Sequence, residues 1–260
     1  MARALARGWG RPVLCADPLA GRARALAAEV GGEAASNNED VARRADLVVL
    51  CHKPAQLNDV AREVAPHAKA VASILAATPL QALRNAYPEQ PVYRFIPSLP
   101  VEVRRGAVVQ GVEVRPADAN EQRTGAAADE AGEQNIALDA EVHDLFAELG
   151  TLVVLPDSLV DVAMGLMSCA PAYVALVAEA QIDAGVRHGI PVAQGAELVV
   201  QTLAGTAELL RRRDNDTQAI RREVASPGGL TARGLAALER AGLRAAFSDA
   251  LDAVLGDARR

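Results

Sequence analysis

Short apolar segments alternate with segments of helical pattern through the first half of the chain, and this alternation limits the fold more than any other feature. The segments predicted as strands are residues 11–17, 45–54, 69–77 and 91–100, and those predicted as helices are residues 18–31, 55–68 and 78–88. Strands that alternate with helices of about 10 to 15 residues form parallel sheets joined by crossover helices. The first half therefore predicts an α/β domain built on a parallel sheet.

The second half has a different composition. Residues 115–138 are polar, acidic and rich in Gly and Ala, as expected of a mobile surface insertion. From Ser158 onward the pattern is almost wholly helical, and residues 159–190 carry few charges along their middle. A helix that is apolar all round must be buried on all sides, which in a domain of this size usually involves a second subunit. We therefore expect an α/β domain at 1–157 and an all-helical dimerisation domain at 158–260.

The composition argues against several classes of function. The net charge of −6 does not suit a phosphate backbone, so nucleic acid is not expected as a partner. Cys15, Cys51 and Cys169 lie far apart without a C-x-x-C spacing, so we expect no disulfide framework, no metal site and a reducing, cytoplasmic setting. No apolar run approaches the roughly 18 residues of a membrane span, and MARALARGWG lacks the apolar centre of a signal peptide.

The first ten residues have the pattern of a helix that is already under way. A dinucleotide-binding fold begins with a central strand and a G-x-G-x-x-G turn, which brings the backbone close to a pyrophosphate at a helix N-terminus. Here residues 11–17 match the second strand of such a fold, with Asp17 where a ribose-binding carboxylate belongs. We therefore expect that about ten residues are missing in front of Met1. The alternative is a protein that lacks this strand and binds no dinucleotide.

Four motifs match one family together. They are EVASPGGLTARGLAALERAGLR (223–244), GLMSCAPAYVALVAEAQIDAGVRHGIP (165–191), ADLVVLCHKPAQL (45–57) and RFIPSLP (94–100). In order and spacing they resemble the pyrroline-5-carboxylate reductases, over nearly the whole chain. The resemblance implies a Rossmann domain, a helical domain that interlocks into a homodimer or larger homo-oligomer, and a small cyclic imine as substrate. In that family a nicotinamide cofactor, NADPH or NADH, delivers a hydride to the C=N carbon of pyrroline-5-carboxylate and gives proline.

The S-P-G-G-x-T stretch carries the expected substrate site. Gly228 and Gly229 have no Cβ, so backbone N–H groups at the start of the following helix can point at the carboxylate of the substrate. By resemblance, Thr231 hydrogen-bonds the imine nitrogen and helps to protonate it, directly or through water. Ser226 and Leu230 complete this loop, although Leu230 replaces a small or hydroxyl residue of the family. The alternative is that Ser226 or Thr231 only caps the helix.

The cofactor site is expected along the strand ends of the first domain. Asp17 can accept hydrogen bonds from an adenosine ribose, which favours NADH, whereas Arg22 and Arg24 could still hold the 2′-phosphate of NADPH. Alternatively, Asp17 is an ordinary turn residue at the end of a strand. The other cofactor positions implied by the resemblance are Asn38, Cys51, His52, Lys53, Pro54 and Ser98. His52 is not expected to act as a catalytic base.

Two departures from the family pattern leave a second hypothesis open. Ser98 stands where the family usually has Asn, and residues 167–170 are Met-Ser-Cys-Ala where it usually has Ser-Gly-Ser-Gly. Side chains at two usual glycines narrow the space and restrict the backbone. A catalytically silent or substrate-divergent paralogue with an assembly or regulatory role is therefore the alternative. A hydroxyacid-type dehydrogenase would need a catalytic Lys in the second domain, and no Lys follows Lys69.

Overall fold

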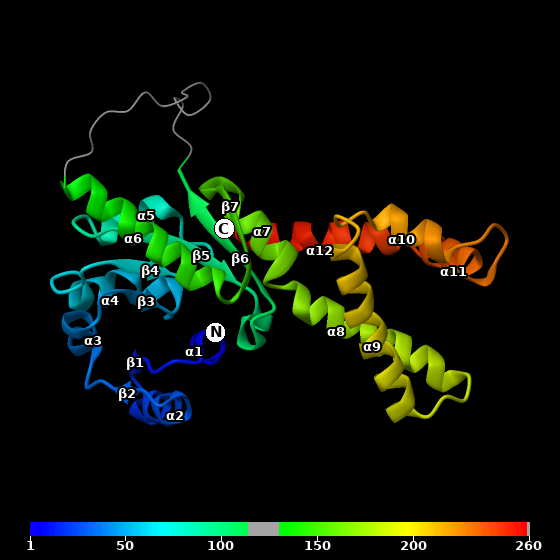
Figure 1. Cartoon of the computed structure of the whole chain (residues 1–260), viewed down its shortest axis with the longest axis horizontal. Coiled ribbons are helices and arrows are strands. Elements are labelled where there is room, and N and C mark those ends of the chain that lie inside the picture. Colours follow the sequence, from blue (N-terminus) through cyan, green and yellow to red (C-terminus); the bar gives the residue numbers. More distant parts are fainter. Residues whose placement is uncertain (114–129, 259–260) are drawn as a thin grey trace, which may run out of the picture. The chain divides into compact units, whose positions relative to one another are not determined.

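The computed structural model describes residues 1–113 and 130–258 of the chain (Figure 1). The chain forms two compact units, Met1–Pro171 and Ala172–Arg260. The first unit is an α/β structure and the second is helical in its described part, which confirms the predicted fold class. The division between the units falls inside helix α8 (Ala170–Arg187), whereas the boundary proposed from the sequence lies directly after the last strand.

The first unit alternates strands with helices. Its strands are β1 (Leu14–Cys15), β2 (Glu33–Ala34), β3 (Val48–Leu50), β4 (Val71–Ser73), β5 (Val92–Pro97), β6 (Gly106–Val112) and β7 (Gly150–Pro156). Its helices are α1 (Ala2–Trp9), α2 (Ala20–Val30), α3 (Asn38–Arg44), α4 (Leu57–Val64), α5 (Leu80–Ala86), α6 (Glu130–Ala147) and α7 (Val160–Met167), with short 3-10 helices η1 (Pro54–Gln56), η2 (Leu99–Val103) and η3 (Asp157–Leu159). The predicted segments contain no counterpart of β2 and α3.

The strands form two sheets. β1 and β2 pair in parallel, and β3, β4, β5, β6 and β7 form a second sheet in that order. Within the described residues, β1 pairs only with β2, and the outer edge of β3 has no partner strand. In the described residues β1 and β3 are not joined to each other.

The second sheet is mixed. β3, β4 and β5 are parallel, as the alternation of strands and helices predicted, and β6 adds an antiparallel neighbour that was not predicted. β5 and β6 run antiparallel, whereas the other neighbouring pairs run parallel. The chain returns from Pro97 to Gly106 through η2, with Arg104 in the left-handed conformation at φ 54°. A connection this short joins antiparallel neighbours, because a parallel neighbour needs a longer crossover such as α6 between β6 and β7.

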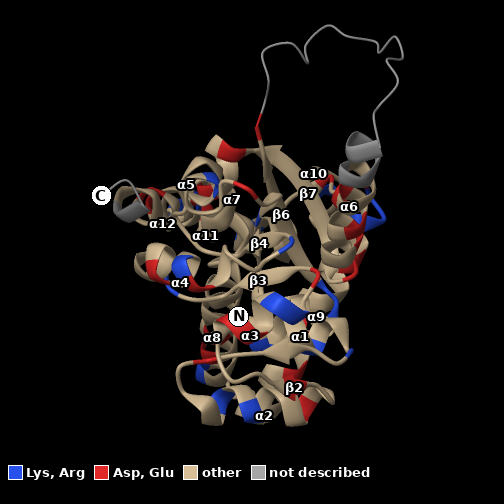
Figure 2. Cartoon of the chain, turned by 90° about the vertical axis from the view of Figure 1, so that its left-hand side faces the viewer, with Lys and Arg blue, Asp and Glu red and all other residues tan. Residues whose placement is uncertain are grey.

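Apolar side chains cover both faces of the second sheet. Around β4, Ala70 and Ala72 pack into one apolar cluster, and Val71 packs into another. Successive side chains of a strand point to opposite faces, so the two clusters lie on opposite faces of the sheet. Helices α1 and α6 contribute to the first cluster, and α3, α4 and α5 contribute to the second. In the view of Figure 2, acidic and basic residues are interspersed along the outer helices and the strands are almost free of charge.

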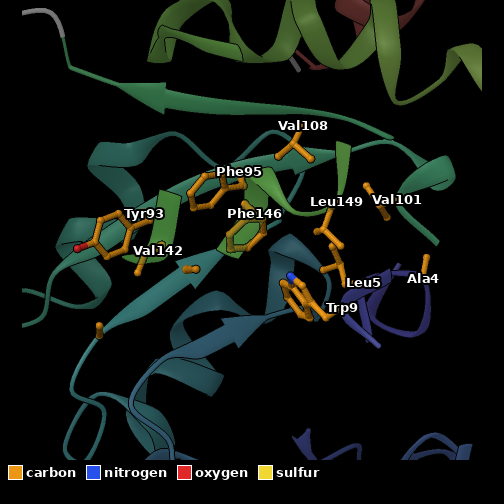
Figure 3. Close-up of a cluster of buried hydrophobic side chains, with 12 residues drawn as sticks. Ala4, Leu5, Trp9, Tyr93, Phe95, Val101, Val108, Val142, Phe146 and Leu149 are labelled. Atoms are coloured by element: carbon orange, nitrogen blue, oxygen red, sulfur yellow. The ribbon is translucent and has the colours of Figure 1, made fainter. Parts of the chain in front are cut away.

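Three aromatic rings occupy the centre of the first cluster (Figure 3). Phe95 of β5 and Phe146 of α6 stack with their ring centroids 3.8 Å apart and an angle of 7° between their planes. Trp9 of α1 meets Phe146 edge-on at 5.6 Å, and its indole N–H donates to the carbonyl of Leu145 at 2.8 Å. The chain has only 3 Phe, 1 Trp and 3 Tyr, and Tyr93 belongs to the same cluster, so four of these seven rings gather where α1 and α6 meet the sheet.

The segment 115–138, expected as a surface insertion, lies mostly outside the described residues. Its last part, residues 130–138, belongs to helix α6. Leu138 packs against the first cluster together with Val142 and Phe146. These three side chains recur every four residues and therefore share one face of the helix. The predicted insertion thus extended too far toward the C-terminus, because Leu138 belongs to this apolar face.

The second unit consists of most of α8 together with α9 (Val192–Arg211), α10 (Thr217–Val224), α11 (Leu230–Arg240) and α12 (Leu243–Ala258). Among residues 172–256, whose burial is described, Gly195 alone is buried. Large apolar side chains are exposed on several helices, including Leu176, Leu198, Leu238 and Phe247. A single chain therefore gives this unit almost no core.

The segment Asp157–Arg187 has the length and composition of a membrane span, with a mean hydropathy of 1.7 over 18 residues. The expectation that no segment has these properties is therefore wrong. Of that window, 17 % is buried inside the described chain. The segment is broken between α7 and α8, where Ser168 and Cys169 form a turn. Length and composition do not by themselves distinguish a span from a helix that a second subunit covers.

Replacing Phe146 with Ala removes the ring that both Phe95 and Trp9 contact. Phe146 is fully buried, so the variant loses the transfer free energy of the ring and leaves a cavity. We expect the free energy of unfolding to fall by about 3 to 5 kcal/mol, measured by chemical denaturation of the full chain.

The control is Val103→Ala, which shortens a side chain that is 67 % exposed at the end of η2. Its free energy of unfolding should stay within about 0.5 kcal/mol of that of the unaltered chain. Equal losses in the two variants would contradict the packing described for Phe146.

Candidate active site

Most residues expected to bind a cofactor follow strands of the first unit. Asp17 lies two residues beyond β1, Cys51 directly follows β3, and Ser98 directly follows β5. In open α/β sheets, ligands bind outside the carboxyl ends of the strands. These three residues therefore lie at strand ends of the correct polarity for a ligand site.

Asp17 has both a structural contact and a free acceptor. Its Oδ1 accepts the backbone N–H of Leu19 at 2.8 Å, as in an Asx turn, and its Oδ2 has no partner among the described residues. One carboxylate oxygen thus remains for ribose hydroxyls. Arg22 and Arg24 are exposed on α2, also without an acidic partner in the described part of the chain. Both guanidinium groups are free to meet a phosphate.

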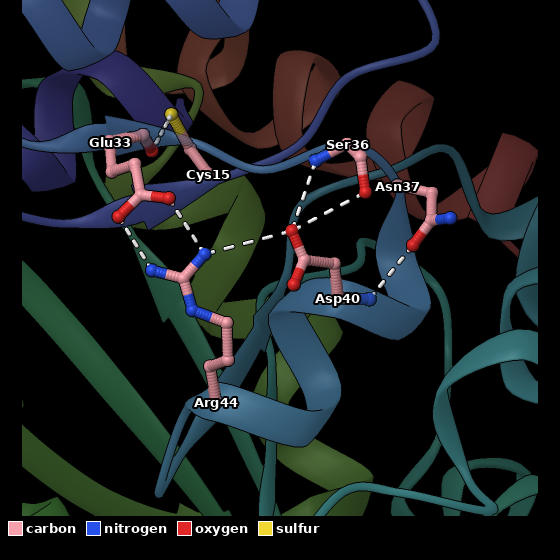
Figure 4. A network of polar contacts seen from close by, with 6 residues as sticks. All are labelled: Cys15, Glu33, Ser36, Asn37, Asp40 and Arg44. Atoms are coloured by element: carbon pink, nitrogen blue, oxygen red, sulfur yellow. Dashed lines mark hydrogen bonds and ion pairs between the residues drawn. The ribbon is translucent and has the colours of Figure 1, made fainter.

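A polar network fixes the connection from β2 to α3 (Figure 4). The guanidinium of Arg44 donates to both carboxylate oxygens of Glu33, at 2.7 and 2.5 Å, and lies 3.6 Å from a carboxylate oxygen of Asp40. Hydrogen bonding from Arg44 holds the pKa of Glu33 below its usual value. Asn37 caps α3 by accepting the N–H of Asp40 at 2.8 Å. The network thereby fixes Asn38, the first residue of the helix.

The side chain of Asn38 is tied to a neighbouring helix. Its Nδ2 donates to Oε2 of Glu63 on α4 at 2.7 Å. Its amide oxygen has no partner within the described ranges. Asn38 can therefore accept a hydrogen bond from a ligand, while Glu63, which the sequence did not suggest, holds its other end.

The loop after β3 is ordered by its own contacts. The N–H of Lys53 donates to Oε1 of Gln56 at 3.1 Å, and Pro54 begins η1. Nδ1 of His52 lies 2.9 Å from the carbonyl oxygen of Lys53, whereas its Nε2 is buried without a partner among the residues described. The ammonium of Lys53 is exposed and likewise has no partner in that part of the chain. The loop thus offers a free cation.

Cys51 is a neutral thiol at physiological pH. Loss of hydration raises the pKa of Cys51 to about 12, although the residue as a whole is exposed and the amino group of Met1 acts in the opposite direction. A protonated thiol is a poor nucleophile.

Ser98 is buried, and its hydroxyl holds strand β6. Its Oγ accepts the N–H of Ala107 at 2.9 Å, and its own N–H donates to the carbonyl of Ala107 at 2.9 Å. A hydroxyl that accepts one hydrogen bond can still donate its hydrogen. Ser98 therefore has a structural contact and keeps one O–H for a ligand.

The S-P-G-G stretch in the second unit is shaped by backbone requirements. Gly228 has φ +69°, in the left-handed region that favours glycine. Gly229 is the N-cap of α11, and a Cβ there would lie 2.4 Å from Oγ of Ser226. Gly228 thus has a dihedral angle that favours glycine, and a Cβ at residue 229 would require the Ser226 hydroxyl to move.

The N-terminus of α11 has no side-chain cap. Its N-cap Gly229 has no side chain, and in the described residues neither Ser226 nor Thr231 donates or accepts a side-chain hydrogen bond there. The alternative that Ser226 or Thr231 only caps the helix is therefore wrong. Free N–H donors and the positive end of the helix dipole remain at this terminus, with the exposed Thr231 in its first turn. This arrangement suits a carboxylate beside a hydroxyl.

The turn at residues 167–170 is not strained by its larger side chains. Ser168 has φ −84° and ψ −35°, and none of the four residues has a positive φ. Ordinary side chains adopt these angles freely. The expected restriction of the backbone is therefore absent. Met167 packs against an apolar cluster formed with β5 and β6.

Arg94, in the middle of β5, has a role that the motifs did not reveal. Its side chain is 1 % exposed, and it pairs with Asp157 at 2.8 Å and with Asp161 at 2.6 Å. A buried charge needs partners, so an Arg between Tyr93 and Phe95 in an apolar strand is the signal that could have identified it.

The expected residues thus fall into two groups. Asp17, Asn38, residues 51–54 and Ser98 belong to the first unit, and residues 226–231 belong to the second. Within the described ranges, no group of three or more His, Cys, Asp or Glu side chains could hold a metal ion. The chemistry available is hydrogen bonding, a helix N-terminus and a free hydroxyl.

Two family models match the chain. One, described as pyrroline-5-carboxylate reductase dimerisation, matches residues 157–260, and the other, described as NADP oxidoreductase coenzyme F420-dependent, matches residues 1–77. The fold agrees with a solved relative as well. The 1-pyrroline-5-carboxylate reductase of Streptococcus pyogenes is similar with a TM-score of 0.82 at 26 % identity, over 99 % of this chain and 94 % of that one.

Curated relatives carry the same name. The pyrroline-5-carboxylate reductase of Synechocystis is 32 % identical over 221 residues, which cover 84 % of this chain and 75 % of that protein. The pyrroline-5-carboxylate reductase of Thermus thermophilus is 34 % identical over 209 residues, which cover 80 % of this chain and 73 % of that protein. The chain belongs to the pyrroline-5-carboxylate reductase family.

Proposed function

We propose that the chain reduces pyrroline-5-carboxylate to proline with a nicotinamide cofactor. The observation that carries the proposal is the uncapped N-terminus of α11 beside the free hydroxyl of Thr231, in a chain whose relatives are named for this reaction. Residues 1–157 bind the cofactor, and residues 158–260 bind the substrate and a second subunit. The intact substrate loop argues against a catalytically silent paralogue.

The free groups of the first unit fit a dinucleotide. Oδ2 of Asp17 and the amide oxygen of Asn38 can accept hydrogen bonds from the adenosine half. Lys53 offers an unpaired ammonium, and the loop of residues 51–54 together with Ser98 lies at strand ends along which such a cofactor extends. When bound, the nicotinamide supplies the hydride for the imine carbon.

The start of α11 holds the substrate. Its free backbone N–H groups and the positive end of the helix dipole bind the carboxylate of the imine, with Ser226, Gly228 and Gly229 shaping the approach. Leu230, which is 80 % exposed, offers an apolar surface for the ring. These contacts orient the imine with its nitrogen toward Thr231.

Thr231 hydrogen-bonds the imine nitrogen and helps to protonate it. Its hydroxyl donates a hydrogen bond to that nitrogen, which becomes more basic as the carbon of the C=N bond receives the hydride. A proton then reaches the nitrogen through this hydroxyl, either directly or from water. One new C–H and one new N–H bond replace the C=N π bond, so the product is the saturated ring.

The second unit supports a homodimer, and the three free cysteines support a cytoplasmic setting. With Gly195 alone buried among residues 172–256, the exposed apolar side chains of these helices need a second chain to cover them. Burial by a second chain would also explain why the segment Asp157–Arg187 is so apolar, without a membrane. Cys15, Cys51 and Cys169 are all free thiols, as is usual in reducing compartments.

Thr231→Ala should lower kcat/KM for pyrroline-5-carboxylate by about 100-fold, because it removes the proton donor at the nitrogen. The measurement is NADPH and NADH oxidation at saturating cofactor. Thr231→Ser keeps a hydroxyl and should recover most of the activity.

The matched control is Thr202→Ala, which removes an exposed hydroxyl that donates to the carbonyl of Leu198 at 2.7 Å on α9. It should leave kcat/KM unchanged. Full activity of Thr231→Ala would remove Thr231 from the mechanism. No oxidation by the unaltered chain, either as these 260 residues or extended upstream of Met1, would reject the reductase itself.

Asp17→Asn should shift the cofactor preference toward NADPH, because it removes the negative charge that repels a 2′-phosphate. We expect the ratio of kcat/KM for NADPH to that for NADH to rise by about tenfold, which corresponds to roughly 1.4 kcal/mol. Asp59→Asn on α4 is the control, since Asp59 is exposed and pairs only with Arg62 among the described residues. An unchanged ratio in Asp17→Asn would assign Asp17 to its turn alone.

A further inference from the structure

The middle of β5 holds the start of α7 through a buried ion pair. Nη1 of Arg94 lies 2.8 Å from Oδ1 of Asp157 in η3, and Nη2 lies 2.6 Å from Oδ1 of Asp161 in the first turn of α7. The Arg94 side chain is 1 % exposed, and the two acids are 19 % and 30 % exposed. A guanidinium this deeply buried cannot lose its partners cheaply, so the attachment is firm.

The end of β5 holds the end of α7 as well. Ser168 is the C-cap of α7, and its Oγ donates to the carbonyl oxygen of Pro97 at 3.1 Å. Pro97 is the last residue of β5 and directly precedes Ser98. Both ends of α7 are therefore bound to β5 by polar contacts.

The two attachments have matching spacing. Pro97 lies three residue steps along the strand from Arg94, which is about 10 Å at roughly 3.3 Å per residue. Ser168 lies seven steps along the helix from Asp161, which is about 10.5 Å at roughly 1.5 Å per helical residue. Both contacts can thus form along an undistorted helix that runs in the direction of the strand. Ile96, Ala163 and Met167 fill the space between them.

Asp157 also contacts the start of helix α5. Its Oδ2 accepts the N–H of Leu80 at 3.0 Å, where α5 begins after the loop that follows β4. That loop contains Ala77 in the left-handed conformation at φ 50°. On the other side, a Cβ on Gly111 of β6 would lie 2.8 Å from Oδ1 of Asp157. The carboxylate therefore contacts β5 and α5 and lies close to β6.

The turn at residues 168–169, which the Ser168 hydrogen bond attaches to β5, lies just before the end of the first unit at Pro171. We propose that Arg94 and Ser168 are positioning residues, which fix the start of α8 to the end of β5 at the point where the chain passes from the cofactor unit to the substrate unit. The inference rests on the proposed reduction, in which the two units supply different reactants. Hydride transfer is sensitive to position, and a displacement of about 1 Å can lower a rate by 100-fold.

The test variant is Ser168→Ala, which removes one hydrogen bond and no buried charge. Its kcat for the reduction should fall by about tenfold, with the KM values for imine and cofactor within about twofold, because binding residues are untouched. Ser168→Thr keeps the hydroxyl and should restore kcat. Ser248→Ala is the matched control, since its hydroxyl donates to the carbonyl of Arg244 at 3.3 Å on α12.

Asp161→Asn tests the ion pair between Arg94 and Asp161 while leaving a side chain of similar size beside the guanidinium. It keeps an oxygen acceptor but removes one charge, and Asp161 is 30 % exposed, so the chain should still fold. The same pattern is expected, a lower kcat with little change in KM. A loss of thermal stability with unchanged kcat would overturn the positioning role of Arg94.

Hydrogen exchange supplies a readout that does not depend on activity. In Ser168→Ala, the amides of residues 168–170 should exchange faster than in the unaltered chain, and in Ser248→Ala they should not. Unchanged exchange, or faster exchange with unchanged kcat, would overturn the proposal. If the unaltered chain reduces no imine, the proposed function fails and the positioning role falls with it, while exchange still shows whether the Ser168 contact holds the turn.

Discussion

A full positive charge in the middle of an apolar strand constrains the first unit more than any other single interaction. Arg94 is buried in β5, so its guanidinium must meet acids, and both acids come from the segment after β7. The chain therefore has to leave the sheet after β7 and fold back over β5. The same Asp157 accepts the N–H of Leu80 at the start of α5, so one carboxylate links η3 to both β5 and α5. The contacts of Arg94 and Asp157 therefore help to set the positions of the residues that would bind a ligand at these strand ends.

Much of the fold could be predicted because its signals are local. The segments 45–54, 69–77 and 91–100 each contain a strand, since their apolar runs are bounded by Pro or charged residues. The helix α3 was missed although Asn37, Glu39 and Asp40 at its start are strong helix signals, because seven residues are too few to show a helical period. The parallel direction of β3, β4 and β5 was predicted from the helices between them, whereas the antiparallel β6 was not, since side-chain alternation carries no information about strand direction.

In the candidate site too, features that arise within a few residues could be predicted from the sequence, and contacts between distant residues could not. The glycines at 228 and 229 could be assigned from the motif, because their requirement arises within a few residues. The partners of the other site residues could not. Asn38 is held by Glu63, 25 residues away, Ser98 by Ala107, 9 residues away, and Arg94 by Asp157, 63 residues away. Such pairs depend on which elements the fold brings together, and a single sequence contains no record of that.

The scarcity of buried residues in the helical unit has a consequence for how this protein responds to dilution. The α/β unit has three apolar clusters of its own, whereas Gly195 alone is buried among residues 172–256. The free energy that orders α8 to α12 is therefore largely released on association, so folding of this unit and pairing of chains form one linked equilibrium. If the chains pair as proposed, dilution below the dissociation constant removes this support from the helical unit. The amount of paired chain then rises with the square of chain concentration rather than in proportion to it.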